Sequence, residues 1–102
     1  DMFDKIKDGD LVTLKLASGE EVIAKFTGKA DTYVSIEKAL VLMQGPQGLA
    51  FATFFSTARQ DVPFDIAISK IVSIAHINDK IRDEYNRVFS KIEVPAKPKI
   101  IT

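Results

Sequence analysis

The sequence predicts an all-β fold, a five-stranded and strongly bent small barrel followed by a C-terminal amphipathic helix. Apolar and polar residues alternate over most of the first 77 residues, and turn-forming residues separate the alternating runs. The spacing then becomes helical until prolines end it. We expect a single domain, with the barrel at about 10–77, the helix at about 78–92 and an extended tail at 93–102.

The first two strands are expected at 12–16 and 22–27, because every second residue in each run is apolar. Between them the Ser18-Gly19 pair predicts a hairpin turn, since glycine adopts the positive φ that such turns require. Gly28 is expected to end the second strand. Ahead of the first strand, residues 1–9 have the spacing of one short helical turn, ended by Asp8-Gly9.

The third strand is expected at 33–43, and its alternation is lost at 39–43, where every residue is apolar. This indicates either that both faces are covered or that a bulge lies near Lys38. Residues 44–48, QGPQG, predict a turn and lack the lysine and the following helix of a phosphate-binding loop.

The fourth strand is expected at 49–57 and is rich in phenylalanine, and a polar connection at 58–63 follows. The fifth strand region is 64–77. Ile66, Ile68, Val72 and Ile74 share one parity there, while Ile71 and Ile77 have the other. Five short, curved strands favour a small barrel over an open sheet, because closure leaves fewer exposed edges.

The helix is expected to begin at Asn78 or Asp79, either of which can cap it. Asp83 and Arg87 have the spacing of an i,i+4 ion pair. The helix is expected to cover an open end of the barrel or, as the alternative, to dock a partner. The apolar stripe consists of Ile81, Tyr85, Val88, Phe89 and Ile92.

The composition limits the classes of function. Hydrophobic residues make up 46% of the chain and charged residues 27%, which is typical of a globular domain. Fourteen basic residues balance fourteen acidic ones, which argues against a non-specific nucleic-acid binder. The chain has no cysteine, which excludes disulfides and thiolate metal sites and fits a cytoplasmic protein. No apolar run is long enough to span a membrane as a helix.

No catalytic motif is found, so we expect no enzyme activity, no metal and no cofactor. His76, the single histidine, has no nearby histidine or cysteine with which to hold a metal and no recognisable nucleophile to activate. A strand-end imidazole with a local hydrogen bond is the simpler interpretation. Lysines could line a phosphate-binding face or simply be solvated; they are Lys25, Lys29, Lys38 and Lys70.

The residues from Val12 to Met43, VTLKLASGEEVIAKFTGKADTYVSIEKALVLM, resemble the first signature of the Sm-like proteins, the small barrels of the Sm, LSm and Hfq group. Gly19 matches the turn glycine, and Asp31 and Tyr33 match the Asp-x-aromatic positions. ISKIVSIAHIND, beginning at Ile68, is similar to their last strand. The chain looks like a phage-encoded, cyanophage-like member, which would place it in the host cytoplasm.

The resemblance implies a closed homo-oligomeric ring, pentamer to heptamer, in which the fourth strand of one subunit pairs with the fifth of its neighbour. It also implies single-stranded RNA as a partner and no membrane. The implied RNA-contact positions are Asp31, Tyr33, Ser35 and Lys70. The implied ring contacts are Phe51, Thr53, Phe55, Ile71 and Ser73.

The chain departs from the family pattern at the residues that contact RNA. Ser35 stands where the family commonly has asparagine, and Ala67-Ile68 stands where it has an Arg-Gly pair. Ala24 replaces a glycine on which the second strand bends. We therefore expect a ring-forming protein that binds RNA weakly. The alternative is a structural or adaptor ring in phage development with no nucleic-acid role.

Overall fold

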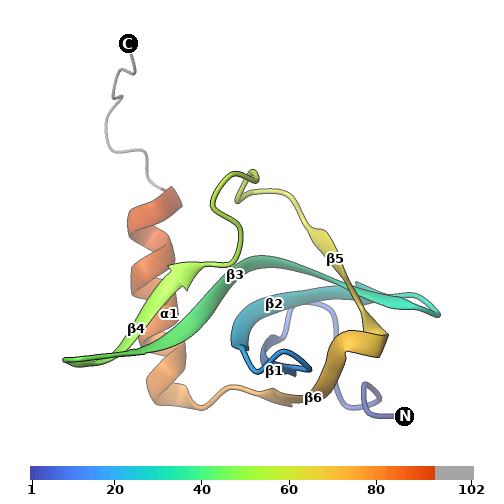
Figure 1. Ribbon diagram of the computed structural model, residues 1–102. Coiled ribbons are helices and arrows are strands. Elements are labelled where there is room, and N and C mark those ends of the chain that lie inside the picture. The colour runs from blue at the N-terminus through green and yellow to red at the C-terminus, as the bar shows by residue number, and fades with distance from the viewer. Residues whose placement is uncertain (94–102) are drawn as a thin grey trace.

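The computed structural model describes the backbone of residues 1–93 and the side chains of residues 1–90 (Figure 1). It confirms the predicted class, a mostly β fold with one helix near the C-terminus. The elements are β1 (Leu11–Leu16), β2 (Glu21–Lys29), β3 (Tyr33–Gly45), β4 (Gly48–Thr53), β5 (Phe64–Ala67), the 3₁₀ helix η1 (Ile68–Lys70), β6 (Ile71–His76) and α1 (Asp79–Glu93). Residues 94–102, which hold most of the expected tail, lie outside the described residues, as does the side chain of Ile92.

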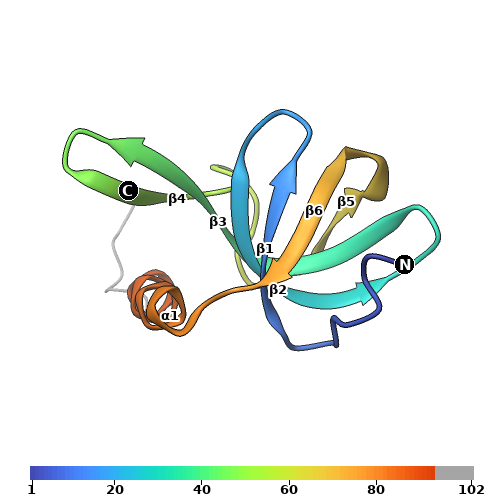
Figure 2. The same ribbon diagram turned by 90° about the horizontal axis from the view of Figure 1, so that it is seen from below.

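All six strands belong to one antiparallel sheet, in which β4, β3, β2, β1 and β6 are neighbours in that order and β5 pairs with the first part of β3. The sheet is strongly bent: in Figure 2, β1, β2, β5 and β6 curl together, and the β3–β4 hairpin extends away beside α1. Among the described residues no ladder joins β6 to β4 or β5. The described sheet is therefore open at this seam, where η1 connects β5 to β6.

The β1–β2 turn is the one expected, with Gly19 at a φ of 108°. The second strand continues past Gly28 to Lys29, because Gly28 pairs with Ser35 across a second register shift. Residues 1–10 form hydrogen-bonded turns instead of the expected helical turn. Within them, Phe3 is buried against the sheet.

The bulge predicted near Lys38 is present. The register between β2 and β3 shifts by one residue between Ile23 and Lys25, and Lys38 has a φ of 53°. A side chain other than glycine is uncommon in this left-handed region, and a bulge is one of the places where it occurs. The bulge divides β3 into a first part that pairs with β5 and a second part that pairs with β4.

The prediction for residues 64–77 was wrong in one respect. They do not form one strand, because η1 interrupts the run and resets its alternation. Val72, expected on the same parity as Ile66, is 61% exposed although Ile66 is buried, and Ile71, expected on the other parity, is 6% exposed and belongs to the core. The fourth strand ends at Thr53, four residues earlier than expected, so Phe54 and Phe55 belong to the β4–β5 loop.

Two separate cores hold the molecule together. The inner core lies within the bent sheet, and its buried members include Leu14, Ala24, Val34 and Ala39. The outer core lies on the other face, where α1 packs on β2, β3 and β4. Its buried members are Ile23, Leu40, Ile77, Tyr85 and Phe89.

The helix begins as expected, because the Asn78 side-chain oxygen accepts a hydrogen bond from the Ile81 amide at 2.8 Å. It covers the outer face of the sheet, where Ile23 and Leu40 present apolar side chains, and not an open end of a barrel. The predicted ion pair of Arg87 with Asp83 is replaced by a pair with Glu84.

Candidate functional site

The turn between β2 and β3 meets η1, and this contact places Asp31 and Tyr33, two positions implied by the resemblance, beside residues 67–69. The Ile68 amide donates to the Thr32 carbonyl at 2.9 Å, and Tyr33 pairs with Ala67 in the β3–β5 ladder. Tyr33 is 41% exposed. An open hollow of about 550 Å³ lies here, which we name the Tyr33 hollow; its lining residues are Asp31, Thr32, Tyr33, Ala67, Ile68 and Ser69.

The two other implied RNA positions lie farther along. Ser35 is half-buried and pairs with Asp65 on the same ladder. It is separated from Tyr33 by one residue, which is buried. Lys70 is exposed at the end of η1, where its carbonyl accepts the Ala17 amide at 2.8 Å. It lines a different hollow, with Leu16, Ala17, Ser18, Phe54, Asp65 and Ile66. The structure therefore does not bring Lys70 into the Tyr33 hollow.

The five implied ring contacts have different surroundings within the chain. Ile71 is buried in the inner core, and Phe51 packs against the outer core, so their side chains already have partners. Thr53 is the last residue of β4, and Ser73 is exposed on β6. Phe55 lies in the β4–β5 loop, 42% exposed.

An aromatic cluster, which sequence reasoning missed, anchors the β4–β5 loop. The rings of Phe54 and Phe64 stack with centroids 5.5 Å apart, and the Phe55 ring meets both edge-on at 5.0 and 4.9 Å. Offset and edge-to-face pairs of this kind add to the free energy gained from burial. The sequence showed the phenylalanines but placed two of them on a strand.

The four lysines that could line one phosphate-binding face, or simply be solvated, are separated by the fold. Lys29 packs over the Phe3 ring at 5.8 Å and lies 3.7 Å from the Asp1 carboxylate, and Lys70 lies on η1. Lys25 and Lys38 line one cleft of about 380 Å³ between α1 and the sheet. The helix adds Asn86 and Ser90 to this cleft. Asn86 and Ser90 are four residues apart, beside the apolar stripe, and this spacing was the sequence signal that both lie on one face of the helix.

His76 is the strand-end imidazole that the sequence predicted. Its Nε2 lies 2.8 Å from Oδ2 of Asp10, which also accepts the Lys7 amide at 2.8 Å. The Lys7 amide, followed by the His76 ring, lowers the pKa of the Asp10 carboxyl below its ordinary value, because both hydrogen bonds favour the charged form. This pair joins the end of β6 to the N-terminal segment.

The described part of the chain holds no group of three histidine, cysteine or acidic side chains placed to bind a metal ion. Within the same residues, no helix is long and apolar enough to cross a membrane. A scan against protein-family models finds no match to this chain, and a search of curated proteins finds none either.

Proposed function

We propose that this protein assembles with copies of itself into a closed ring through the free edges of β4 and β6. The observation that carries the proposal is the strand order, which leaves these two strands at opposite ends of the described sheet, each with one partner. An exposed strand edge invites pairing with another chain. Pairing β4 of one copy with β6 of the next is a head-to-tail contact, which forms a ring where the rotation closes.

The exposed side chains on these strands support the same contact. Leu49 on β4 is 57% exposed and Val72 on β6 is 61% exposed, although both are apolar. Neither strand carries a lysine, an acidic residue or a proline within its bounds. Proteins commonly place such residues on an edge strand to prevent it from pairing with another chain. Their absence from β4 and β6 leaves contact between the edges of two copies unopposed by charge.

We further propose that the ring binds single-stranded RNA weakly at the Tyr33 hollow. An exposed aromatic ring can stack on a base of any sequence, and Tyr33 is placed on the rim of an open hollow. The binding is weak because the lining includes Asp31 and no lysine or arginine. Phosphate neutralisation, which usually supplies most of the affinity, is missing at this site.

The acidic character of the hollow favours the second candidate, a ring that serves as a structural or adaptor protein with no nucleic-acid role. Asp65 lies on the ladder beside the hollow, so Asp31 is not its only nearby carboxylate. The half-exposed Phe55 beside Phe54 and Phe64 offers a partner protein an aromatic contact. Binding of RNA decides between the two candidates.

Light scattering on purified protein tests the ring. We expect a single oligomer larger than a dimer, and we expect Val72→Asp to convert it to a folded monomer, because the new charge lies on the β6 edge. Met2→Asp places the same charge on an exposed apolar residue outside β4 and β6, and it should leave the oligomer intact. A wild-type monomer, or equal effects of the two substitutions, contradicts the ring.

Titration of labelled oligo-U at low salt tests the RNA site. Tyr33→Ala should weaken binding by about 5- to 150-fold, which corresponds to the loss of one stacked base, and Tyr33→Phe should keep most of the affinity. The ring should remain in both variants. If wild-type protein gives no signal at high micromolar concentration, the RNA role is wrong and the adaptor ring is the remaining candidate.

A further inference from the structure

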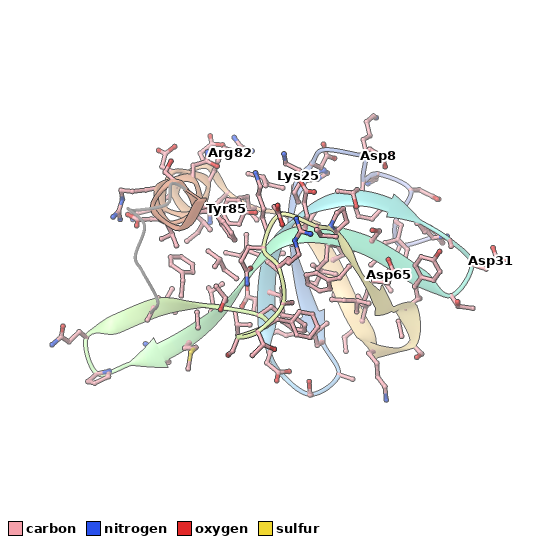
Figure 3. All side chains as sticks on the ribbon, turned by 90° about the horizontal axis from the view of Figure 1, so that it is seen from above. Asp8, Lys25, Asp31, Asp65, Arg82 and Tyr85 are labelled. Atoms are coloured by element: carbon pink, nitrogen blue, oxygen red, sulfur yellow. The ribbon has the colours of Figure 1, made fainter. Side chains whose placement is uncertain are left out.

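The cleft between α1 and the outer face of the sheet differs in charge from the Tyr33 hollow. Of its lining residues within the described part of the chain, Lys25 and Lys38 are basic and none is acidic. Figure 3 shows Tyr85 of α1 and Lys25 on the same side of the molecule, with Asp31 at the far tip of the β2–β3 hairpin. Among the residues whose side chains the structure describes, the lining consists of Gly9, Leu11, Lys25, Lys38, Tyr85, Asn86, Phe89 and Ser90.

The bulge in β3 brings Lys38 to the cleft. Lys38 has a left-handed backbone conformation, which costs free energy for a residue with a Cβ atom. The Tyr85 hydroxyl donates to the Lys38 carbonyl at 2.6 Å and so fixes this conformation against α1. Bulges commonly redirect a side chain near a functional site, and this one places a cation where the strand meets the helix.

Lys25 enters the same cleft from β2. Its charged neighbour is Glu37, with Nζ and Oε2 3.8 Å apart. That distance is too long for a hydrogen bond, so Glu37 acts on Lys25 as a neighbouring charge. Both side chains are partly buried, at 37% and 21% exposure, which reduces the screening of the lysine charge by water.

We propose that this cleft binds a phosphate group. Two lysine ammonium groups, the Asn86 amide and the Ser90 hydroxyl supply donors of the kind that phosphate oxygens accept. The walls from Leu11 and Phe89 are apolar, and charge interactions strengthen next to such surfaces. The phosphate is either free, as an ion or monoester, or part of a nucleic-acid backbone. The proposal does not depend on the ring or on RNA binding at Tyr33.

The test is a titration of ¹⁵N-labelled protein with inorganic phosphate, uridine monophosphate and a short oligo-U, followed by amide chemical shifts at ionic strength held constant with NaCl. We expect saturable shifts at residues 25, 38, 86 and 90. The double variant Lys25→Gln, Lys38→Gly should weaken binding about tenfold or more, as expected for lost hydrogen bonds to a charged ligand. Glycine at 38 tolerates the positive φ, so this variant should remain folded.

The chain provides a matched control. Lys15 lies 3.9 Å from Glu21 on the neighbouring strands and outside the cleft, so Lys15→Gln should change phosphate affinity by less than about twofold. Glu37→Gln should strengthen binding about two- to fivefold, because it removes the negative charge beside Lys25. Glu21→Gln should have no such effect. These single variants decide the matter if the double variant proves unstable.

The three ligands distinguish the source of the phosphate. Lysine-dependent binding of inorganic phosphate or uridine monophosphate identifies a free phosphate, and lysine-dependent binding of oligo-U alone identifies the backbone of a nucleic acid. A response that the double variant retains, or that NaCl reproduces, overturns the proposal. Tyr33→Ala should leave phosphate affinity within about twofold. The phosphate cleft and the RNA site at Tyr33 are therefore tested independently of each other.

Discussion

The inner and outer cores are built from similar apolar side chains but by different parts of the chain. The inner core is filled mainly by strand residues, which pair both across short turns, as Leu14 does with Val22, and over long separations, as Leu14 does with Ile74. The outer core needs α1, whose Tyr85 hydroxyl donates to the Lys38 carbonyl across 47 residues of sequence. Only the outer core therefore depends on docking of the helix.

This difference explains the all-apolar stretch at residues 39–43. Ala39 belongs to the inner core and Leu40 to the outer core, and Val41 and Leu42 continue the alternation between the two. Both explanations offered by the sequence are therefore correct: a bulge lies at Lys38, and both faces of this part of β3 are covered. The comparison predicts that damage to the inner core unfolds the whole domain, whereas damage to the outer core releases mainly the helix.

The largest effect is expected from Leu14→Ala. Leu14 is fully buried in the inner core, and truncation of such a side chain costs about 3–5 kcal/mol of the free energy of unfolding. Urea denaturation followed by circular dichroism should show strand and helix signals lost in one transition, at a much lower midpoint. A shift of less than about 1 kcal/mol would contradict the central role given to the inner core.

Phe89→Ala should produce a smaller and more local effect. Phe89 is 4% exposed in the outer core, and its truncation should cost about 2–4 kcal/mol locally while the sheet stays folded. Hydrogen exchange measures this directly, because the amides of α1 should lose protection while those of β1 and β2 keep it. Equal loss of protection in the helix and the sheet would show that the two cores unfold as one unit.

Tyr85→Phe isolates the hydrogen bond that joins α1 to the bulge. Removing the hydroxyl leaves the Lys38 carbonyl without the donor seen at 2.6 Å, and we expect a loss of about 1–2 kcal/mol. Val88→Ala, at a half-buried position on the same helix, gives the cost of a small apolar deletion without that bond. Lys38→Gly keeps the carbonyl that accepts this bond, so Tyr85→Phe should cost about the same in that background as in wild type. A loss no larger than that of Val88→Ala would mean that the hydroxyl does not stabilise the contact between α1 and the bulge.

The smallest effect is expected at Asp10, where the N-terminal segment meets β6. The pKa of Asp10 is lower in the folded protein than its ordinary value of 3.8, so its carboxylate stabilises the fold above that pH. This contribution disappears as the pH falls through the folded-state pKa. Asp10→Asn should therefore be less stable than wild type at about pH 5, and the difference should shrink as the pH falls below the ordinary pKa of the carboxyl.

Urea midpoints measured across this pH range test the Asp10 prediction, with Asp83→Asn as the control on an exposed carboxylate of α1. The control should show no comparable pH-dependent difference from wild type. A destabilisation by Asp10→Asn that stays constant down to low pH would mean that the side chain contributes through packing and not through its charge.

The candidate sites follow the same division as the cores. The Asp31 and Tyr33 positions were recognised from one continuous stretch, and the turn that carries them is set by local strand pairing. The cleft with Lys25 and Lys38 was recognised only as scattered lysines. Its residues come from the N-terminal segment, three strands and α1, and their meeting depends on where the helix docks.

The sequence by itself determined the strands of the first two hairpins, the Gly19 turn, the bulge near Lys38 and the Asn78 cap. Each of these follows from side-chain alternation or from the backbone preference of a few adjacent residues. Only the tertiary structure decided the break at η1, the outward direction of Val72 and the face that α1 covers. These features depend on contacts between segments far apart in the chain, and alternation within one segment carries no information about them.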